Sequence, residues 1–293
     1  MTHDEAFIQA IREAPHDDTP RLIYADWLEE HGQADRADFI RIQCQLTRMT
    51  DPHPGLFSGF FSLKAREEGL LRRNWNEWVC PLREIVGPRY QRYGMNWLGG
   101  EYHPDGREHF RRGFVDRLSL HAESFIRHAE RLSRLTALRE LSLWGAGQCA
   151  AELANVTALS GLSILAFVDY YDAPLMARDA MALASSPFLH GISRLFLGYN
   201  SLGDEGVESL VRAPWLVGVH FLDLTDNGLS DGAARALAES PYLGNVRTLH
   251  VRKNAFSAAG ISALTTSATL RRLQRLEYDP PTANGSSVGS CTP

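Results

Sequence analysis

Apolar residues recur along the second half of the chain at a constant interval, the step from Leu195 to Leu222 and again from Leu222 to Leu249. Three pairs, each with a single residue between its members, mark successive units: Leu195 and Leu197, Leu222 and Leu224, Leu249 and Val251. An asparagine follows each pair at the same distance: Asn200, Asn227 and Asn254. Intervals of about 20 to 50 residues are typical of repeat proteins, in which each unit packs against its neighbours. The chain is therefore predicted to contain a repeat array.

Each repeat is predicted to hold one short strand and one helix. Residues two apart in a strand lie on the same side, so both apolar residues of a pair point into the core. The asparagine side chain both donates and accepts hydrogen bonds, so it can satisfy backbone groups where the chain leaves the strand. Beyond it, Val207, Leu210 and Val211 have the spacing of an apolar helix face. The expected fold class is an α/β solenoid with parallel strands on its concave face and helices on its convex face.

The same interval extends the array in both directions, to three further pairs: Val168 and Tyr170, Leu141 and Leu143, Leu276 and Tyr278. A shorter step leads back from Leu141 to a first pair, Leu118 and Leu120. Ala146 and Ala173 occupy the asparagine position in early units, so looser turns are expected there. About six or seven repeats are expected over residues 115–279.

Residues 1–50 are predicted to form a compact helical module. Thr2 and Glu5 have the spacing of a capping box at the start of a helix. Thr19 is the expected N-cap of a second helix, and Gly32 its left-handed end. A third helix carries charges at spacings that allow exposed pairs within the helix: Asp35, Arg36, Asp38 and Arg41.

The rest of the chain outside the repeats divides into a connecting region and a tail. Residues 51–114 start at a proline- and glycine-rich break and include a helical stretch from about Leu63 to Ile85. Residues 87–112 are rich in Gly, Tyr, Trp and His and are expected to be irregular. Residues 280–293 contain no charged or aromatic side chain and are expected to be disordered.

The pattern LxLxxNxLxDxG, followed by a helix, resembles ribonuclease-inhibitor-type leucine-rich repeats over about residues 115–279. That family consists mostly of scaffolds that bind different ligands, so the resemblance implies a fold and a binding role. The strings PRLIYADWLEEHG (20–32) and RADFIRIQ (36–43) are similar to the bacterial repeat-companion domain. Residues 110–114, FRRGF, are also typical of such proteins. The resemblance implies a bacterial origin and transfers no catalytic residue.

Composition narrows the classes of function. Hydrophobic residues make up 44% of the chain, which is ample for a packed core. The net charge of −5 argues against a nucleic-acid-binding protein, which normally carries a basic face. No apolar run approaches the roughly 20 residues that span a bilayer, and the acidic N-terminus lacks the order of a secretion signal. With four scattered cysteines, these features favour the cytoplasm.

Three motifs that would indicate an enzyme are absent from the sequence, the P-loop, GxGxxG and HExxH patterns. The closest histidine pairs, His103 with His109 and His121 with His128, lack the spacing of a metal site. We therefore expect a non-catalytic protein, with no metal and no cofactor.

The residues between and beside the core leucines are predicted to lie on the concave face, because strand side chains alternate. Aromatic and charged residues are concentrated there, as in protein interfaces. The candidate binding residues are Trp144, Phe167, Asp169, Tyr171, Asp172, Phe196, Tyr199, Phe221, Asp223, Asp226, His250 and Arg252. Four of these are aspartates, so the expected partner is a basic or amphipathic protein or peptide. Neither nucleic acid nor a membrane is expected as a partner.

Two other functions stay open. The tail has the hydroxyl and thiol composition of a ribosomally made peptide core, for which the folded repeats would be an oversized leader recognised by a modifying enzyme. The candidate modification sites are Ser286, Ser287, Ser290, Cys291 and Thr292. A ligase-type effector that selects substrates through its repeats is the second alternative, although residues 51–113 contain no recognisable catalytic set.

Overall fold

The computed structural model divides the chain into two compact units. The described residues are 2–49, 57–86, 109–168 and 173–280. Unit 1 comprises Met1–Ser119 with His128–Arg139, and unit 2 comprises Leu120–Arg127 with Glu140–Pro293. The boundary crosses strand β3 (Arg117–His121) and helix α5 (Ala122–Leu135), so both elements contribute residues to each unit. No described helix has the length and apolar composition needed to cross a bilayer.

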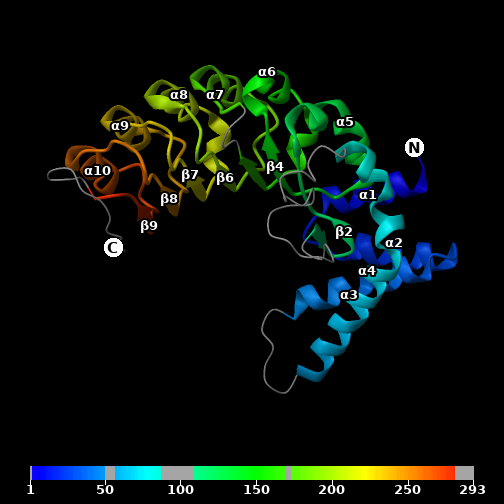
Figure 1. Ribbon diagram of the computed structural model, residues 1–293. Coiled ribbons are helices and arrows are strands. Elements are labelled where there is room, and N and C mark those ends of the chain that lie inside the picture. The colour runs from blue at the N-terminus through cyan, green and yellow to red at the C-terminus, as the bar shows by residue number, and fades with distance from the viewer. Residues whose placement is uncertain (1, 50–56, 87–108, 169–172, 281–293) are drawn as a thin grey trace. The chain divides into compact units, whose positions relative to one another are not determined.

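Unit 1 begins with the helices α1 (His3–Glu13), α2 (Thr19–Glu30), α3 (Ala34–Arg48) and α4 (Phe57–Val86) (Figure 1). The capping box is confirmed, because the Glu5 N–H donates to the Thr2 hydroxyl at 3.2 Å and the Thr2 N–H donates to the Glu5 carboxylate at 2.9 Å. Helix α2 begins slightly earlier than predicted, since Thr19 is its first residue and donates its N–H to Asp17 Oδ1 at 2.8 Å. Gly32 follows α2 with φ of +80°, as predicted.

The core of unit 1 joins the first three helices to a short hairpin. Its members include Ile11, Leu28, Ile40 and Phe114, all of them buried. Tyr24 stacks on Phe114 with ring centroids 5.9 Å apart and donates its hydroxyl hydrogen to Asp4 Oδ1 at 2.8 Å. The only strongly polar atom of this aromatic side chain is therefore satisfied while its ring is buried.

The charged residues of α3 contact neighbouring helices rather than one another. Asp38 accepts two hydrogen bonds from Arg66 of α4, at 2.8 and 2.9 Å. Arg41 pairs with Asp26 of α2 at 2.6 Å. The predicted pairs within α3 are wrong, because α3 packs between α2 and α4 and its charges reach acids and bases on both.

Arg36 of α3 lies among aromatic rings. Its guanidinium carbon is 4.7 Å from the ring centroid of Trp78 and 5.6 Å from those of Phe39, Phe110 and Phe114. Burial lowers the pKa of Arg36 to about 10, and its Nη1 has no hydrogen-bond partner among the described residues. Cation–π attraction from the rings offsets part of the cost of removing the charge from water. Arg36 thus contacts aromatic rings from α3, α4 and the hairpin.

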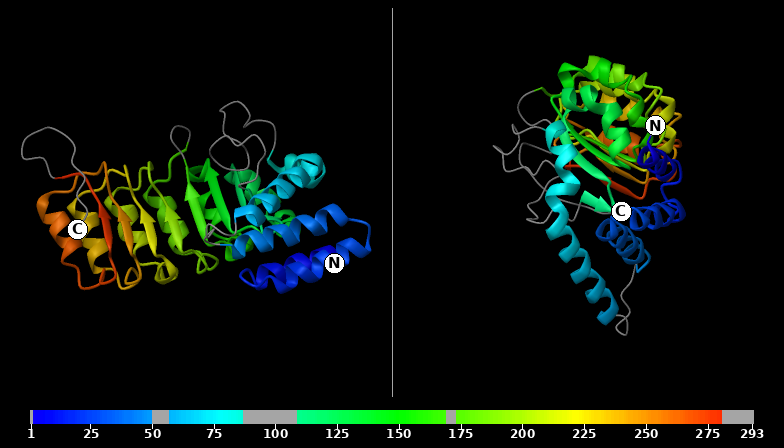
Figure 2. Two further views of the ribbon diagram at one scale, coloured as in Figure 1. Left: turned by 90° about the horizontal axis from the view of Figure 1, so that it is seen from below. Right: turned by 90° about the vertical axis from the view of Figure 1, so that its right-hand side faces the viewer.

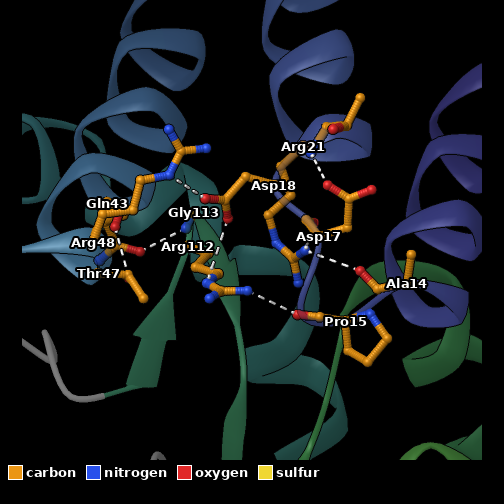
Figure 3. Close-up of polar contacts among 11 residues, drawn as sticks. Ala14, Pro15, Asp17, Asp18, Arg21, Gln43, Thr47, Arg48, Arg112 and Gly113 are labelled. Carbon is orange, nitrogen blue, oxygen red and sulfur yellow. Dashed lines mark hydrogen bonds and ion pairs between the residues drawn. The ribbon is translucent and has the colours of Figure 1, made fainter.

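The hairpin consists of β1 (Phe110–Arg111) and β2 (Phe114–Val115), which pair antiparallel. Its two turn residues both have positive φ, +52° at Arg112 and +89° at Gly113, as a type I′ turn requires. The Gly113 N–H donates to Gln43 Oε1 at 2.6 Å (Figure 3). Residues 110 and 111, expected to be irregular, are therefore a strand held against α3.

Unit 2 contains a parallel sheet in which the strands follow one another in chain order, from β3 to β9 (Figure 2). After β3 its strands are β4 (Glu140–Trp144), β5 (Ile164–Phe167), β6 (Arg194–Phe196), β7 (Phe221–Asp223), β8 (Thr248–His250) and β9 (Arg275–Glu277). The helical segments between them are η3 (Ala146–Gln148), α6 (Ala150–Leu153), η4 (Thr157–Gly161), α7 (Ala177–Ala184), α8 (Gly203–Leu210), η5 (Pro214–Gly218), α9 (Asp231–Glu239) and α10 (Ala258–Thr265). Helices α7 to α10 lie on one side of the sheet (Figure 1). Among the described residues of this unit, no helix covers the other side of β6 to β9.

The predicted core positions are confirmed in most strands but not in β5. Leu195, Leu222 and Leu249 are aligned in register and are at most 1% exposed. In β5, however, Leu165 is the residue aligned with Leu195, and Phe167 is aligned with Leu143. The step from Leu141 to Leu165 is therefore shorter than the regular interval, and the step from Leu165 to Leu195 is longer. The core position predicted at Val168 is wrong, because Leu165 and Phe167 are aligned with Leu141 and Leu143. Tyr170, the other member of the predicted pair, lies outside the described residues.

The constant spacing of the three asparagines has a structural cause. Asn227 Nδ2 donates to Leu197 O at 2.8 Å, and its Oδ1 accepts from the Leu202 N–H at 3.4 Å. Asn254 repeats this arrangement, with Nδ2 donating to Leu224 O at 2.9 Å and Oδ1 accepting from the Leu229 N–H at 3.0 Å. Each asparagine therefore satisfies backbone groups of the preceding repeat, as its donor and acceptor pair predicted.

Replacing Asn227 with Ala is expected to lower the free energy of unfolding by about 2 to 4 kcal/mol, because buried backbone groups of the neighbouring repeat lose their partner. Asn227 is 1% exposed. Asn155→Ala is the control, since Asn155 is exposed and its side chain, within the described residues, donates only to Ala151 O of its own turn, at 2.8 Å. Its effect should stay within about 0.5 kcal/mol in urea unfolding followed by circular dichroism. Equal losses from both variants would contradict the bridging role.

Candidate partner-binding face

The open strand face is the side of strands β4 to β9 that is opposite the helices. Register places its side chains in two rows across the sheet. The first row holds Glu140, Ile164, Arg194, Phe221, Thr248 and Arg275. The second row holds Ser142, Ala166, Phe196, Asp223, His250 and Glu277. All of these side chains are at least partly exposed, whereas the leucines between the rows are buried.

An aromatic cluster occupies the middle of this face. Phe196 and Phe221, on adjacent strands, have ring centroids 4.7 Å apart with planes tilted by 39°. The His250 ring meets Phe221 edge-on at 4.9 Å. All three side chains are half-buried, so their rings are held by one another while part of each stays in contact with solvent. Rigid, partly exposed rings can be buried by a partner at little entropic cost.

Arg194 adds a positive charge to this cluster. Its guanidinium carbon lies 4.9 Å from the ring centroid of Phe221 and 5.2 Å from that of Phe196. The side chain is exposed, and among the described residues it forms no ion pair with a carboxylate. A guanidinium that is positioned by rings but lacks an acidic partner can receive a carboxylate in two parallel hydrogen bonds.

The other charges of the face are mostly paired within it. His250 Nε2 lies 3.5 Å from Glu277 Oε2, and Glu277 also pairs with Arg275. Arg252 Nε donates to Asp279 Oδ1 at 3.3 Å. Positive and negative groups therefore alternate toward the last strand.

Tyr199, Asp226 and Lys253 occupy equivalent positions in three successive repeats, each just before the bridging asparagine. All three have left-handed backbones, with φ of +62°, +53° and +55°. The Lys253 ammonium lies 4.8 Å from the Tyr199 ring centroid and donates to its hydroxyl at 3.4 Å. A left-handed conformation costs about 1 to 3 kcal/mol outside glycine, so these turns are held by the surrounding hydrogen bonds.

The structure brings together most of the predicted binding residues that it describes. Phe196, Tyr199, Phe221, Asp223, Asp226, His250 and Arg252 lie on the open strand face or at its edge, and Trp144 is half-buried at the end of β4. Phe167 is a correction: it is 3% exposed and points into the core beside Leu143, because the register of β5 differs from the prediction. Asp169, Tyr171 and Asp172 lie outside the described residues, as do the tail sites at 286–292.

Arg194 was not among the predicted binding residues. A signal for it was present in the sequence, since Arg194 precedes Leu195 and must share a face with Phe196 in an alternating strand. The prediction included the residue before the core leucine in β7, Phe221, but omitted the equivalent residue in β6. Arg275 of β9 was omitted in the same way.

Two cysteines and one histidine outside this face are buried, and burial shifts the pKa of each, whereas Cys80 is exposed. Burial raises the pKa of the Cys149 thiol to about 11 and that of the Cys44 thiol to about 12. Burial lowers the pKa of His109 to about 3, so this side chain stays neutral at ordinary pH. In the part of the chain that the structure describes, no three side chains of His, Cys, Asp or Glu converge as metal ligands would.

Comparison with known proteins identifies two leucine-rich repeats. Residues 193–211 and 219–238 match the family described as Leucine Rich repeat. The first segment contains β6 and α8, and the second contains β7 and nearly all of α9. A search of curated proteins returned no match.

Proposed function

We propose that this chain is a non-catalytic scaffold that binds a protein or peptide on its open strand face. The observation that carries the proposal is the cluster of Phe196, Phe221 and His250, with Arg194 placed over the two phenyl rings. Folding alone does not require partly exposed aromatic rings on three adjacent strands. Clusters of aromatic residues with arginine are typical of the energetic centres of protein interfaces.

The proposal extends the repeat array beyond the two matched segments, to a solenoid over residues 115–279 of the ribonuclease-inhibitor type. Its support is the continuous register of buried leucines from β4 to β9 and the asparagine bridges between repeats. In such a solenoid the open strand face is the concave one. The similarity of residues 20–43 to a repeat-companion module and a bacterial, cytoplasmic setting remain parts of the same proposal.

The chemistry of the face favours an amphipathic partner segment. Arg194 offers a site for a carboxylate, and the two phenyl rings beneath it offer an apolar surface. Asp223, next to Phe196 in the sheet, uses one carboxylate oxygen for the Thr225 N–H at 2.9 Å and has a second oxygen for a donor. We therefore expect an acidic residue beside an aromatic or aliphatic one in the partner, with a basic or amide group following.

Selection of a displayed library of random peptides on the purified chain tests this proposal. Peptides with a carboxylate beside an apolar side chain should be enriched. Phe221→Ala is expected to weaken binding of a selected peptide about 30-fold, since truncating a central aromatic residue typically costs at least about 2 kcal/mol. Calorimetry with wild type and variant measures the change, and a thermal melt verifies that the variant stays folded.

Two controls sharpen the experiment. Tyr242→Ala removes a half-buried aromatic ring that follows α9, away from the open strand face, and should leave binding within about twofold. Arg194→Gln should weaken binding about tenfold for the acidic peptide but not for the same peptide with Gln in place of its acid. Unchanged binding by Phe221→Ala, or an equal loss from Tyr242→Ala, would show that the partner binds elsewhere.

A further inference from the structure

A groove of about 460 Å³ lies between the segments of α8 and α9, on the helix side of the unit 2 sheet (Figure 1). Two small residues of α9, Gly232 and Ala236, are among those that line it. Ser240, which follows α9, donates its hydroxyl hydrogen to Val211 O at 2.6 Å and so joins the two segments where both helices end. The groove is therefore built into the packing of two successive repeats.

Opposite charges occupy equivalent positions on the two sides of this groove. Four charged residues line it: Glu208, Arg212, Arg235 and Glu239. Glu208 follows the buried Val207 in α8, and Arg235 follows the buried Ala234 at the same position of α9. Arg212 and Glu239 each lie two residues after the buried leucine of their repeat. The charges thus form two rows across the groove, and the sign alternates along each side as well as across.

The chain does not pair these charges internally. All four side chains are exposed, and within the residues that the structure describes none of them forms an ion pair. Arg235 Nε donates to Asp231 O of its own helix at 3.2 Å, which leaves its carboxylate-binding edge open. Glu208 and Arg212 have the spacing of a favourable pair along a helix, yet they are not in contact. The four groups are therefore available to a second molecule.

The charged pattern is confined to this groove. The equivalent positions in α7 and α10, and just after each helix, are uncharged: Met181, Ser185, Ser262 and Thr266. With two positive and two negative groups, the patch has no net charge, so a partner of one sign would gain at two positions and be repelled at the other two. Its complement is a surface with the same alternation at the same spacing, and a second copy of this chain carries that surface. Met181 is 54% exposed beside the patch and adds an apolar contact area.

We propose that two copies of this chain associate through the groove between α8 and α9. A two-fold axis brings a patch against the same patch of the other copy. If the axis crosses the helices, Glu208 faces the partner's Arg212; if it follows the groove, Glu208 faces the partner's Arg235. In either arrangement every charged residue of the patch meets an opposite charge. The groove and the open strand face lie on opposite sides of the sheet, so the two proposals fail or hold independently.

Sedimentation of the full chain between about 1 and 200 μM tests the proposal. We expect a monomer–dimer equilibrium whose dissociation constant rises with salt, because exposed ion pairs are screened. Glu208→Arg should raise that constant at least about tenfold, since it makes two attractive contacts of each dimer repulsive. Glu152→Arg is the matched control, because Glu152 is an exposed glutamate of α6 that does not line the groove. It should change the constant less than about twofold.

Two charge exchanges test the pairing itself. Glu208→Arg combined with Arg212→Glu should restore the dimer if the axis crosses the helices. Glu208→Arg combined with Arg235→Glu should restore it if the axis follows the groove. One of the two double variants should return the constant to within about threefold of wild type, and circular dichroism verifies that each variant is folded. A chain that stays monomeric at about 200 μM, a dimer unaffected by Glu208→Arg, or failure of both exchanges would overturn the proposal.

Discussion

Leu222→Asp is expected to unfold the repeat array. Leu222 is 1% exposed at the centre of β7 and is aligned with Leu195 on one side and Leu249 on the other. Loss of the leucine side chain costs about 2 to 5 kcal/mol, and an unpaired buried carboxylate adds several more. Because a domain is stable by only about 5 to 15 kcal/mol, the sum approaches the whole stability. Each repeat packs only on its neighbours, so the damage should spread from β7 through the array.

Far-ultraviolet circular dichroism and urea unfolding of the variant measure this loss. Thr248→Asp is the matched control, because it places the same charge in the neighbouring strand on the open strand face, where Thr248 is half-exposed. It should shift the free energy of unfolding by about 1 kcal/mol or less. Leu222→Met, which conserves volume, should cost less than about 1.5 kcal/mol. A cooperative transition of Leu222→Asp at the wild-type urea concentration would exclude the assigned core position.

The core of unit 2 was predictable because the constant spacing of its leucines follows from the way successive repeats pack on one another. Leu195, Leu222 and Leu249 keep one interval since each must meet the same position of its neighbour in the sheet. Asn200 and Asn227 keep that interval because each binds backbone groups one repeat away. A feature that repeats in the structure has to repeat in the sequence, and such features are the ones that a sequence pattern reveals.

The register of β5 could not be predicted by the same argument. Register fixes which residues of adjacent strands meet, but it does not fix the length of the loop between them, and longer loops cost little free energy. Here one interval is shorter and the next is longer than the regular one, so the total from Leu141 to Leu195 matches two regular repeats. Val168 and Phe167 are both apolar, and the pattern alone does not decide between them. Phe167 was therefore placed on the wrong face.

In unit 1 the sequence failed to predict a contact for a different reason. Residue type suggested that the charges of α3 lie in solvent, yet Arg36 lies among four aromatic rings that come from separate parts of the chain. Only the tertiary fold brings Trp78 and Phe110 to this residue, so no local sequence pattern predicts the contact. The hairpin, in contrast, had a local signal in Arg112-Gly113, since glycine at the second position suits a two-residue turn.

Gly113→Ala is expected to destabilise unit 1 by about 2 to 6 kcal/mol, the sum of an overpacking cost and a backbone cost. A methyl group on Gly113 would lie 2.4 Å from Ile40 Cγ1 and 2.8 Å from Ile40 Cα, and Ile40 is fully buried in α3. Overpacking of this kind typically costs about 1 to 3 kcal/mol, and the left-handed backbone adds about 1 to 3 more. The hairpin would have to move away from α3, which would also break the hydrogen bond from the Gly113 N–H to Gln43.

The variant Gly32→Ala separates the overpacking cost from the cost of the left-handed backbone. Gly32 has a similar φ of +80°, but a methyl group there would meet nothing within 4 Å, so only the backbone strain remains. That variant should lose about 1 to 2 kcal/mol. Urea unfolding gives both losses, and hydrogen exchange at the amides of α2 and α3 assigns them to unit 1. If Gly113→Ala costs no more than Gly32→Ala, the hairpin packs loosely on α3. A clear excess would show that the hairpin packs closely on α3 where Gly113 meets Ile40.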